Sequence, residues 1–229
     1  GMEPDEQAAV RTYTKDRYDQ NIAFTDDALG TFLEGLDDST TVIVFADHGE
    51  EFWEHGGFEH GHSLYDELVR VPLIIKGPGV DAGRHDTPVS LLDIAPTARA
   101  LAGVSAGETD GASLVGLLGG EALAPRVLGL GRSYYTPDLW GAVGGGQKWI
   151  TGDGGQELYA LASDPGEQQD LAEQGGLEAW PAQASGALGL PIESVIRLRA
   201  RGRASDQPVS LTVTHPAGIT RWWPAYDYR

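Results

Sequence analysis

The stretch that decides the fold is Thr41-Val42-Ile43-Val44-Phe45-Ala46-Asp47-His48-Gly49-Glu50. Its first half is a run of β-branched and aromatic residues, which is typical of a short buried strand. Asp47 and His48 follow where that strand ends, and in open α/β sheets ligands bind beyond the carboxyl ends of the strands. A carboxylate and an imidazole at that edge can bind a divalent cation. The sequence therefore predicts metal ligands at Asp47 and His48, with Gly49 letting the backbone turn away from the ion.

The segment after this strand is unusually rich in histidine. Four of the six histidines of the chain lie between residues 48 and 62, mixed with acids and glycines. Such a mixture of imidazoles, carboxylates and flexible backbone is typical of a functional loop, so we expect the site to extend to about residue 68.

An ordered series of motifs continues from this loop toward the C-terminus. It consists of Asp47-His48-Gly49-Glu50, Glu54-His55-Gly56, His60-Gly61-His62-Ser63-Leu64-Tyr65-Asp66-Glu67, Arg70-Val71-Pro72-Leu73-Ile74-Ile75, Gly77-Pro78-Gly79, Leu92-Asp93-Ile94-Ala95-Pro96-Thr97, Ala102-Gly103-Val104, Asp110-Gly111-Ala112-Ser113-Leu114, Lys148-Trp149-Ile150, Glu157-Leu158-Tyr159-Ala160-Leu161 and Asp164-Pro165-Gly166-Glu167-Gln168. In this order the series resembles the sulfatases of the alkaline phosphatase superfamily. The resemblance covers about residues 15–175 and corresponds to the C-terminal half of a sulfatase.

The resemblance implies a fold, a reaction and a set of site residues. The fold is α/β, part of a doubly wound alkaline-phosphatase-like sheet with a small antiparallel C-terminal subdomain. The reaction is hydrolysis of a sulfate ester by a formylglycine hydrate, with Ca²⁺ or Mg²⁺ holding the sulfate oxygens; hard, oxygen-rich ligation suits these ions. Asp47 and His48 would ligate the ion. The catalytic candidates are His60 and His62, because the spacing to Tyr65 allows either to face the sulfate. His55 is expected to shape the loop.

Two parts of a complete sulfatase site have no counterpart here. The chain has no cysteine and no Ser-x-Pro-x-Arg motif, so the source of formylglycine is missing. The early strand that ends in paired aspartates is missing too, because Asp26-Asp27 falls within an apolar pattern of helical spacing. We therefore expect a C-terminal fragment that carries an incomplete metal shell and is inactive alone.

Two other functions stay open from the sequence. Many sulfatases have asparagine where this chain has His48, and the histidine resembles phosphodiesterases and phosphomonoesterases of the same superfamily, which use a Ser or Thr nucleophile and two metal ions. The other alternative is a non-catalytic domain for binding or assembly.

The charge balance limits the partners. The chain has 34 acidic and 16 basic residues, a formal net charge of −18. An acidic surface argues against nucleic acid, whose backbone requires a basic one. The sequence contains no apolar run of 18 residues, so no membrane contact is expected. The expected partner is a sulfate ester, either a small molecule or a glycan, and the localisation is left open.

The chain divides into three expected regions. Residues 1–125 would form the C-terminal part of the α/β core, with a helix at about 9–36, strands at 41–46 and 71–76, a helix capped by Asp93, and a short helix near 113–118. Residues 126–175 would form the antiparallel subdomain, with strands at 127–134, 139–143, 147–151 and 157–161 and a closing helix after Asp164-Pro165. Residues 176–229 would be a linker, with 175–190 rich in Gly, Ala and Pro, and a β-rich tail in which 194–201 pairs with 209–213. Unpaired edges on the strands at 41–46 and 71–76 favour self-association.

Overall fold

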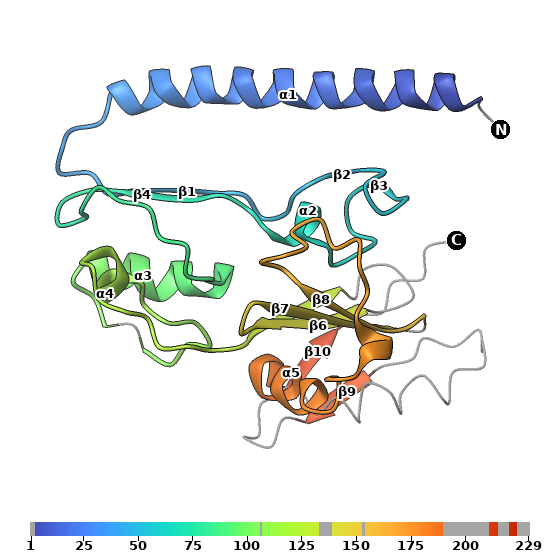
Figure 1. The fold of residues 1–229 in the computed structure, drawn as a ribbon. Coiled ribbons are helices and arrows are strands. Elements are labelled where there is room, and N and C mark those ends of the chain that lie inside the picture. The colour runs from blue at the N-terminus through green and yellow to red at the C-terminus, as the bar shows by residue number, and fades with distance from the viewer. Residues whose placement is uncertain are drawn as a thin grey trace.

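The computed structural model describes residues 3–105, 107–132, 139–152 and 154–189, together with the backbone of 211–214 and 220–223. Figure 1 shows a long helix along one side, a small sheet beneath it, and short helices beside a larger sheet. The small sheet has two strands and the larger one has four. Within the part of the chain that is described, no helix is both long and apolar enough to cross a membrane.

The long helix is α1, Pro4–Glu34. It starts five residues earlier than predicted, because Pro4 is compatible with the first turn and the Glu3 N–H donates to the Glu6 carboxylate at 3.1 Å. Asp26-Asp27 lies within this helix, as the apolar spacing indicated. The helix touches the rest of the molecule mainly through its N-terminal half, where the Tyr18 ring meets Phe52 edge-on at 5.2 Å.

The two-stranded sheet is formed by β1, Val42–Phe45, and β4, Leu73–Lys76. Both predicted strands are present, and they pair antiparallel with Val42 opposite Lys76 and Phe45 opposite Leu73. Each strand therefore keeps one unpaired edge within the described chain. All described strand pairs are antiparallel, so the doubly wound parallel arrangement stays a prediction.

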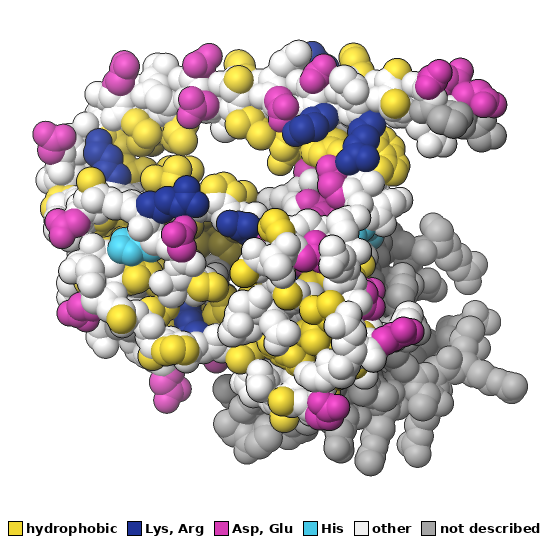
Figure 2. All heavy atoms as spheres, in the orientation of Figure 1, with side chains coloured by type: hydrophobic (Ala, Val, Ile, Leu, Met, Phe, Trp, Pro, Cys, Tyr) yellow, Lys and Arg dark blue, Asp and Glu magenta, His cyan; other side chains and the backbone are white. Residues whose placement is uncertain are grey.

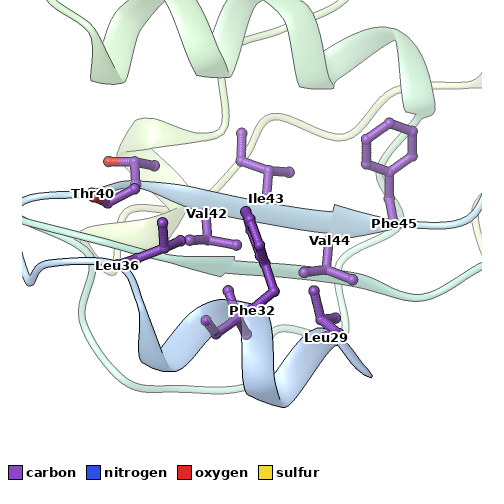
Figure 3. A pocket seen from close by; sticks show the side chains of 10 residues that line it. Leu29, Phe32, Leu36, Thr40, Val42, Ile43, Val44 and Phe45 are labelled. Atoms are coloured by element: carbon purple, nitrogen blue, oxygen red, sulfur yellow. The ribbon is translucent and has the colours of Figure 1, made fainter. Parts of the chain in front are cut away.

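An apolar hollow lies between α1 and β1. Figure 3 shows Phe32 and Leu36 pointing toward Val42 and Val44, while Ile43 points to the opposite face of the strand. The hollow measures about 520 Å³. Figure 2 shows hydrophobic side chains exposed on the side of α1 that faces the sheet.

Asp93 lies at the predicted N-cap position of the next helix, but its side chain makes no capping hydrogen bond to that helix. Ser90 caps a short 3-10 helix, Leu91–Asp93, with its hydroxyl accepting the Leu92 N–H at 3.2 Å, and α3, Ile94–Leu101, follows directly. The Asp93 carboxylate turns inward instead: it accepts the N–H groups of Ser90 and Ala112 and pairs with Arg126. Burial opposes its ionisation, but these donors outweigh burial and lower the pKa of Asp93.

The antiparallel subdomain is confirmed. Its strands are β5, Leu128–Arg132; β6, Leu139–Gly144; β7, Gln147–Gly152; and β8, Gly155–Ala160. They pair in sequence order. The short helix α4, Val115–Leu118, precedes them, near its predicted position. The main core of the molecule lies on this sheet, around Ala142, Trp149 and Leu158.

The linker predicted at 175–190 is wrong over most of its length. A 3-10 turn, Ala172–Gln174, is followed by α5, Trp180–Leu188, which buries Trp180 and Ala184 against the sheet. Small residues let the helix approach closely: a Cβ on Gly129 would lie 2.7 Å from the Leu188 side chain. A composition of Gly and Ala therefore marks close packing here rather than a flexible connection.

Only one strand of the predicted tail hairpin lies within the described residues. The strand expected at 209–213 is present as β9, Leu211–Thr214, but its antiparallel partner is β10, Thr220–Trp223. The expected partner strand, 194–201, lies outside the described residues.

Candidate active-site loop

The loop between β1 and β4 carries every candidate site residue. It contains a small hairpin, β2 Glu51–Phe52 paired with β3 Phe58–Glu59, and a one-turn helix, α2 Asp66–Val69. The hairpin closes through the Trp53 N–H, which donates to the Gly57 carbonyl at 2.9 Å. We refer to residues 47–69 as the site loop.

Asp47 and His48 lie together at the end of β1. The Asp47 side chain is 86% exposed, and its Oδ1 lies 3.8 Å from His48 Nε2. His48 Nδ1 lies 2.8 Å from the Gly49 carbonyl oxygen, which can only accept a proton. This contact requires a proton on Nδ1, and Nε2 is the ring nitrogen that lies beside the Asp47 carboxylate.

This arrangement fits a divalent ion, but only in part. Metal-binding imidazoles commonly fix their orientation by donating the second ring N–H to a carbonyl, as His48 does. An imidazole nitrogen and a carboxylate oxygen separated by 3.8 Å are close enough to reach one ion at bond lengths of about 2.0–2.6 Å. Among the described residues no group of three or more His, Cys, Asp or Glu is arranged to hold a metal. Asp47 and His48 could therefore supply only two ligands of a metal site.

His60 lies directly against His48. The two rings stack with centroids 4.0 Å apart and an angle of 25° between their planes. His60 Nδ1 is 3.0 Å from Glu50 Oε1, so the carboxylate orients the ring and leaves Nε2 free of that contact. The structure thus brings Asp47, His48 and His60 into one exposed cluster.

His62 is placed differently from His60. Its Nε2 lies 2.6 Å from Oε2 of Glu51, whose side chain is 1% exposed. The other Glu51 oxygen accepts the N–H groups of His55 and Gly57 at 3.0 and 2.6 Å. Burial opposes ionisation of Glu51, but the donors together lower its pKa. His62 is therefore directed into the base of the hairpin, away from the Asp47–His48–His60 cluster.

His55 connects the site loop to the subdomain, in agreement with its expected structural role. Its Nδ1 lies 2.5 Å from Glu67 Oε1, its Nε2 lies 3.0 Å from the Glu167 carbonyl, and its ring stacks on Tyr65 at 3.6 Å. Burial disfavours the charged imidazole, but these acceptors outweigh burial and raise the pKa of His55.

The sequence reasoning missed a buried ion cluster beneath the loop. Lys148 on β7 lies 2.5 Å from the Asp66 carboxylate and 2.7 Å from Glu167, and both Lys148 and Glu167 side chains are 0% exposed. Burial raises the pKa of Glu167. The signal available in the sequence was weak: Lys148 is one of only three lysines in the chain and lies within one of the quoted motifs.

The chain is similar to known proteins both in sequence and in structure. The sulfatase family model matches residues 3–104. The choline-sulfatase of Rhizobium meliloti is 33% identical over 167 residues, covering 68% of this chain and 32% of that protein. A delta 4,5-hexuronate-2-O-sulfatase of Bacteroides thetaiotaomicron is 34% identical over 152 residues, covering 59% and 31%. The chain thus spans about a third of the length of these relatives.

A solved structure agrees with the sequence relatives. A 2-O GAG sulfatase superposes on 73% of this chain and 39% of its own with a TM-score of 0.56 and 27% identity. The superposed part is longer than the segment of residues 3–104 that the family model matches. The chain therefore belongs to the sulfatase family.

Proposed function

We propose that this chain is the C-terminal part of a metal-dependent sulfuric ester hydrolase. The observation that supports this most directly is the Asp47–His48 pair, in which a tautomer fixed by Gly49 aims Nε2 at the same side as the Asp47 carboxylate. The stacked His60 adds a proton-bearing group next to that pair.

Each residue then has a distinct task. Asp47 and His48 would hold a Ca²⁺ or Mg²⁺ ion, which when bound neutralises charge on the sulfate oxygens. His60, oriented by Glu50, would place an N–H donor where negative charge develops on the ester oxygen that leaves. His62 would set the hairpin geometry through Glu51, and through it the position of His60.

The nucleophile would come from outside this chain. Formylglycine arises from cysteine or serine in a set motif; the chain has no cysteine and no Ser-x-Pro-x-Arg. We expect the polypeptide alone to show no turnover of an aryl sulfate above that of a mock purification. Turnover that exceeds this control and disappears in Asp47→Ala would contradict the fragment assignment.

The affinity for metal tests the site directly. With two ligands the chain should bind Ca²⁺ more weakly than complete sensor-type sites, which bind in about the 10⁻⁷–10⁻⁵ M range. Calorimetric titration should show a weak response that Asp47→Asn removes. A stoichiometric, low-micromolar site that depends on Asp47 would show that the shell is already complete.

The substrate class is proposed from the relatives. One relative is named for choline sulfate and another for a hexuronate 2-O-sulfate, so both a small alcohol and a sugar occur among their substrates. We infer a sulfate ester of a small molecule or a glycan for the complete enzyme. Among the described strands, β1 and β4 each have one unpaired edge, and these edges beside the apolar hollow also support the proposal that the isolated chain self-associates on that side.

A further inference from the structure

Lys148 forms a buried ion cluster with Asp66 and Glu167. A short series of hydrogen bonds connects this cluster to the proposed metal ligand His48, although Lys148 and His48 are far apart in the sequence. The Lys148 ammonium donates to the Leu64 carbonyl at 3.2 Å and pairs with Asp66, so a residue of β7 holds both the segment before α2 and its first residue. Because its side chain is completely buried, the position of this charge is fixed by its partners.

Glu167 holds the same helix from a second direction. Its Oε2 accepts the N–H of Asp66 at 2.5 Å, an amide at the start of α2 that has no partner within the helix. Its backbone has a φ of 51°, a conformation that non-glycine residues rarely adopt. The surrounding contacts must therefore hold Glu167 in place at an energetic cost.

The far end of α2 holds the backbone next to the metal ligands. The Leu68 carbonyl accepts the Gly49 N–H at 2.9 Å. The approach is so close that a Cβ on Gly49 would lie 1.9 Å from the Glu67 carbonyl oxygen. The Gly49 carbonyl in turn accepts the His48 Nδ1 proton. One turn of helix thus separates the buried cluster from the group that sets the tautomer of His48.

We propose that Lys148 and Glu167 are positioning residues for His48: from the antiparallel subdomain they fix α2, α2 fixes Gly49, and Gly49 orients the imidazole. This inference rests on the proposed role of His48 as a metal ligand. A cluster kept only for stability would be expected to be apolar, because well-packed hydrophobic residues are often as stabilising as a buried ion pair or more so. The strained backbone of Glu167 and the close contact that requires glycine at residue 49 both lie between Lys148 and His48. A positioning role for this series of contacts would explain why the strain is retained.

The test compares Glu167→Gln with the wild-type chain by NMR. Three signals are followed: the exchange rate of the Gly49 amide, the imidazole ¹⁵N shifts that report the His48 tautomer, and the broadening of His48 by Mn²⁺. We expect faster Gly49 exchange, mixed tautomers, and a roughly 10- to 100-fold weaker apparent Mn²⁺ affinity, the range found when outer-shell partners of metal ligands are changed. Lys148→Met should show larger changes of the same kind. Glu167→Gln serves as the test if Lys148→Met does not fold.

Arg126→Met is the matched control. It breaks the buried pair with Asp93, whose other partners, Ser90 and Ala112, lie outside the site loop. This variant should lower the urea midpoint while leaving the three signals unchanged. Unchanged signals in Glu167→Gln, or equal changes in Arg126→Met, would overturn the proposal. Absence of Mn²⁺ broadening in the wild-type chain would refute the metal role of His48, whereas the exchange and tautomer signals would still decide the positioning role.

Discussion

At the scale of single residues, Gly49 is the most constrained position of the site loop. Its backbone passes so close to α2 that no side chain fits without displacing the Glu67 carbonyl. The sequence suggested glycine here for its freedom to turn. The structure adds a second reason, because the missing side chain is what permits the Gly49–Leu68 hydrogen bond.

We predict that Gly49→Ala lowers the free energy of unfolding by about 3 kcal/mol, because the added methyl group meets backbone atoms that cannot move aside cheaply. Gly30→Ala is the control: it lies within α1 with no atom within 4 Å of the new Cβ. It should raise stability by about 0.5–1 kcal/mol through helix propensity. Urea unfolding of both variants checks the prediction, and equal effects would contradict it.

His55 makes stability depend on pH. Its pKa is higher in the folded chain than the ordinary value of about 6.5, because Glu67 and the Glu167 carbonyl favour the charged ring. A raised pKa contributes stability that is fully present below the unfolded value and is lost as the pH rises through the folded one. As the pH rises above about 6.5, the urea midpoint should therefore fall more steeply in the wild-type chain than in His55→Gln. Identical slopes would exclude this contribution.

Part of the site could be predicted from the sequence because its residues are close neighbours along the chain. Asp47 and His48 are adjacent, and His60 follows within one short hairpin, so local chain direction is enough to gather them. Lys148 and Glu167 contact Asp66 across 82 and 101 positions. No local pattern records such pairings. The different placements of His60 and His62 could not be predicted from the sequence either, since they differ by their partner carboxylates, Glu50 and Glu51.

At the scale of elements, the β2–β3 hairpin connects α1 to the site. Phe52 is 6% exposed and receives the edge of Tyr18, while the Lys15 ammonium lies 5.8 Å from the centre of its ring. Arg11 reaches Glu54 at 3.2 Å. These contacts explain why a helix with so few neighbours keeps its place.

We predict that Phe52→Ala lowers the free energy of unfolding by about 3–5 kcal/mol, as expected when a buried phenylalanine is truncated. Phe24→Ala is the matched control, because that ring is 75% exposed on α1, and its effect should stay within about 0.5 kcal/mol. Chemical unfolding followed by tryptophan fluorescence measures both. A small loss in Phe52→Ala would mean that the hairpin and α1 separate at little cost.

Most elements were predictable because their residues carry a strong local pattern. The strands of the subdomain alternate and are bounded by glycines, so their limits were found within a few residues. Helix α5 was missed for the opposite reason. Its Ala, Gly and Ser residues form no apolar stripe, and only the contacts of Trp180 and Ala184 with the sheet reveal a buried face.

At the scale of the whole molecule, the hollow between α1 and β1 is an apolar surface that no other described residue covers. Phe32 is 63% exposed, and Ile74 on β4 is 61% exposed. Contiguous apolar surface of this kind favours association, and open strand edges add hydrogen-bonding groups to it.

We predict concentration-dependent association through this side. Phe32→Glu should reduce it, because the variant places a charge in the hollow. Tyr13→Glu is the control, adding the same charge at a 67% exposed position of α1 that does not line the hollow. Sedimentation velocity over a range of concentrations distinguishes the two. A wild-type chain that stays monomeric at all concentrations would contradict the prediction, and equal reductions would show that charge alone is responsible.

The hydrogen bond from Asp66 to Glu167 has a consequence for how such a chain can be recombined. The boundary near residue 125 looks like a place to exchange one subdomain for another, but Lys148, Glu157 and Glu167 reach across it to Asp66 and Tyr65. A chimera that joins this site loop to a relative's sheet would therefore inherit half of a charge cluster. Such chimeras should fold only when the donor sheet has a lysine and a glutamate at the positions of Lys148 and Glu167. These two side chains therefore decide which sheets can be combined with this site loop.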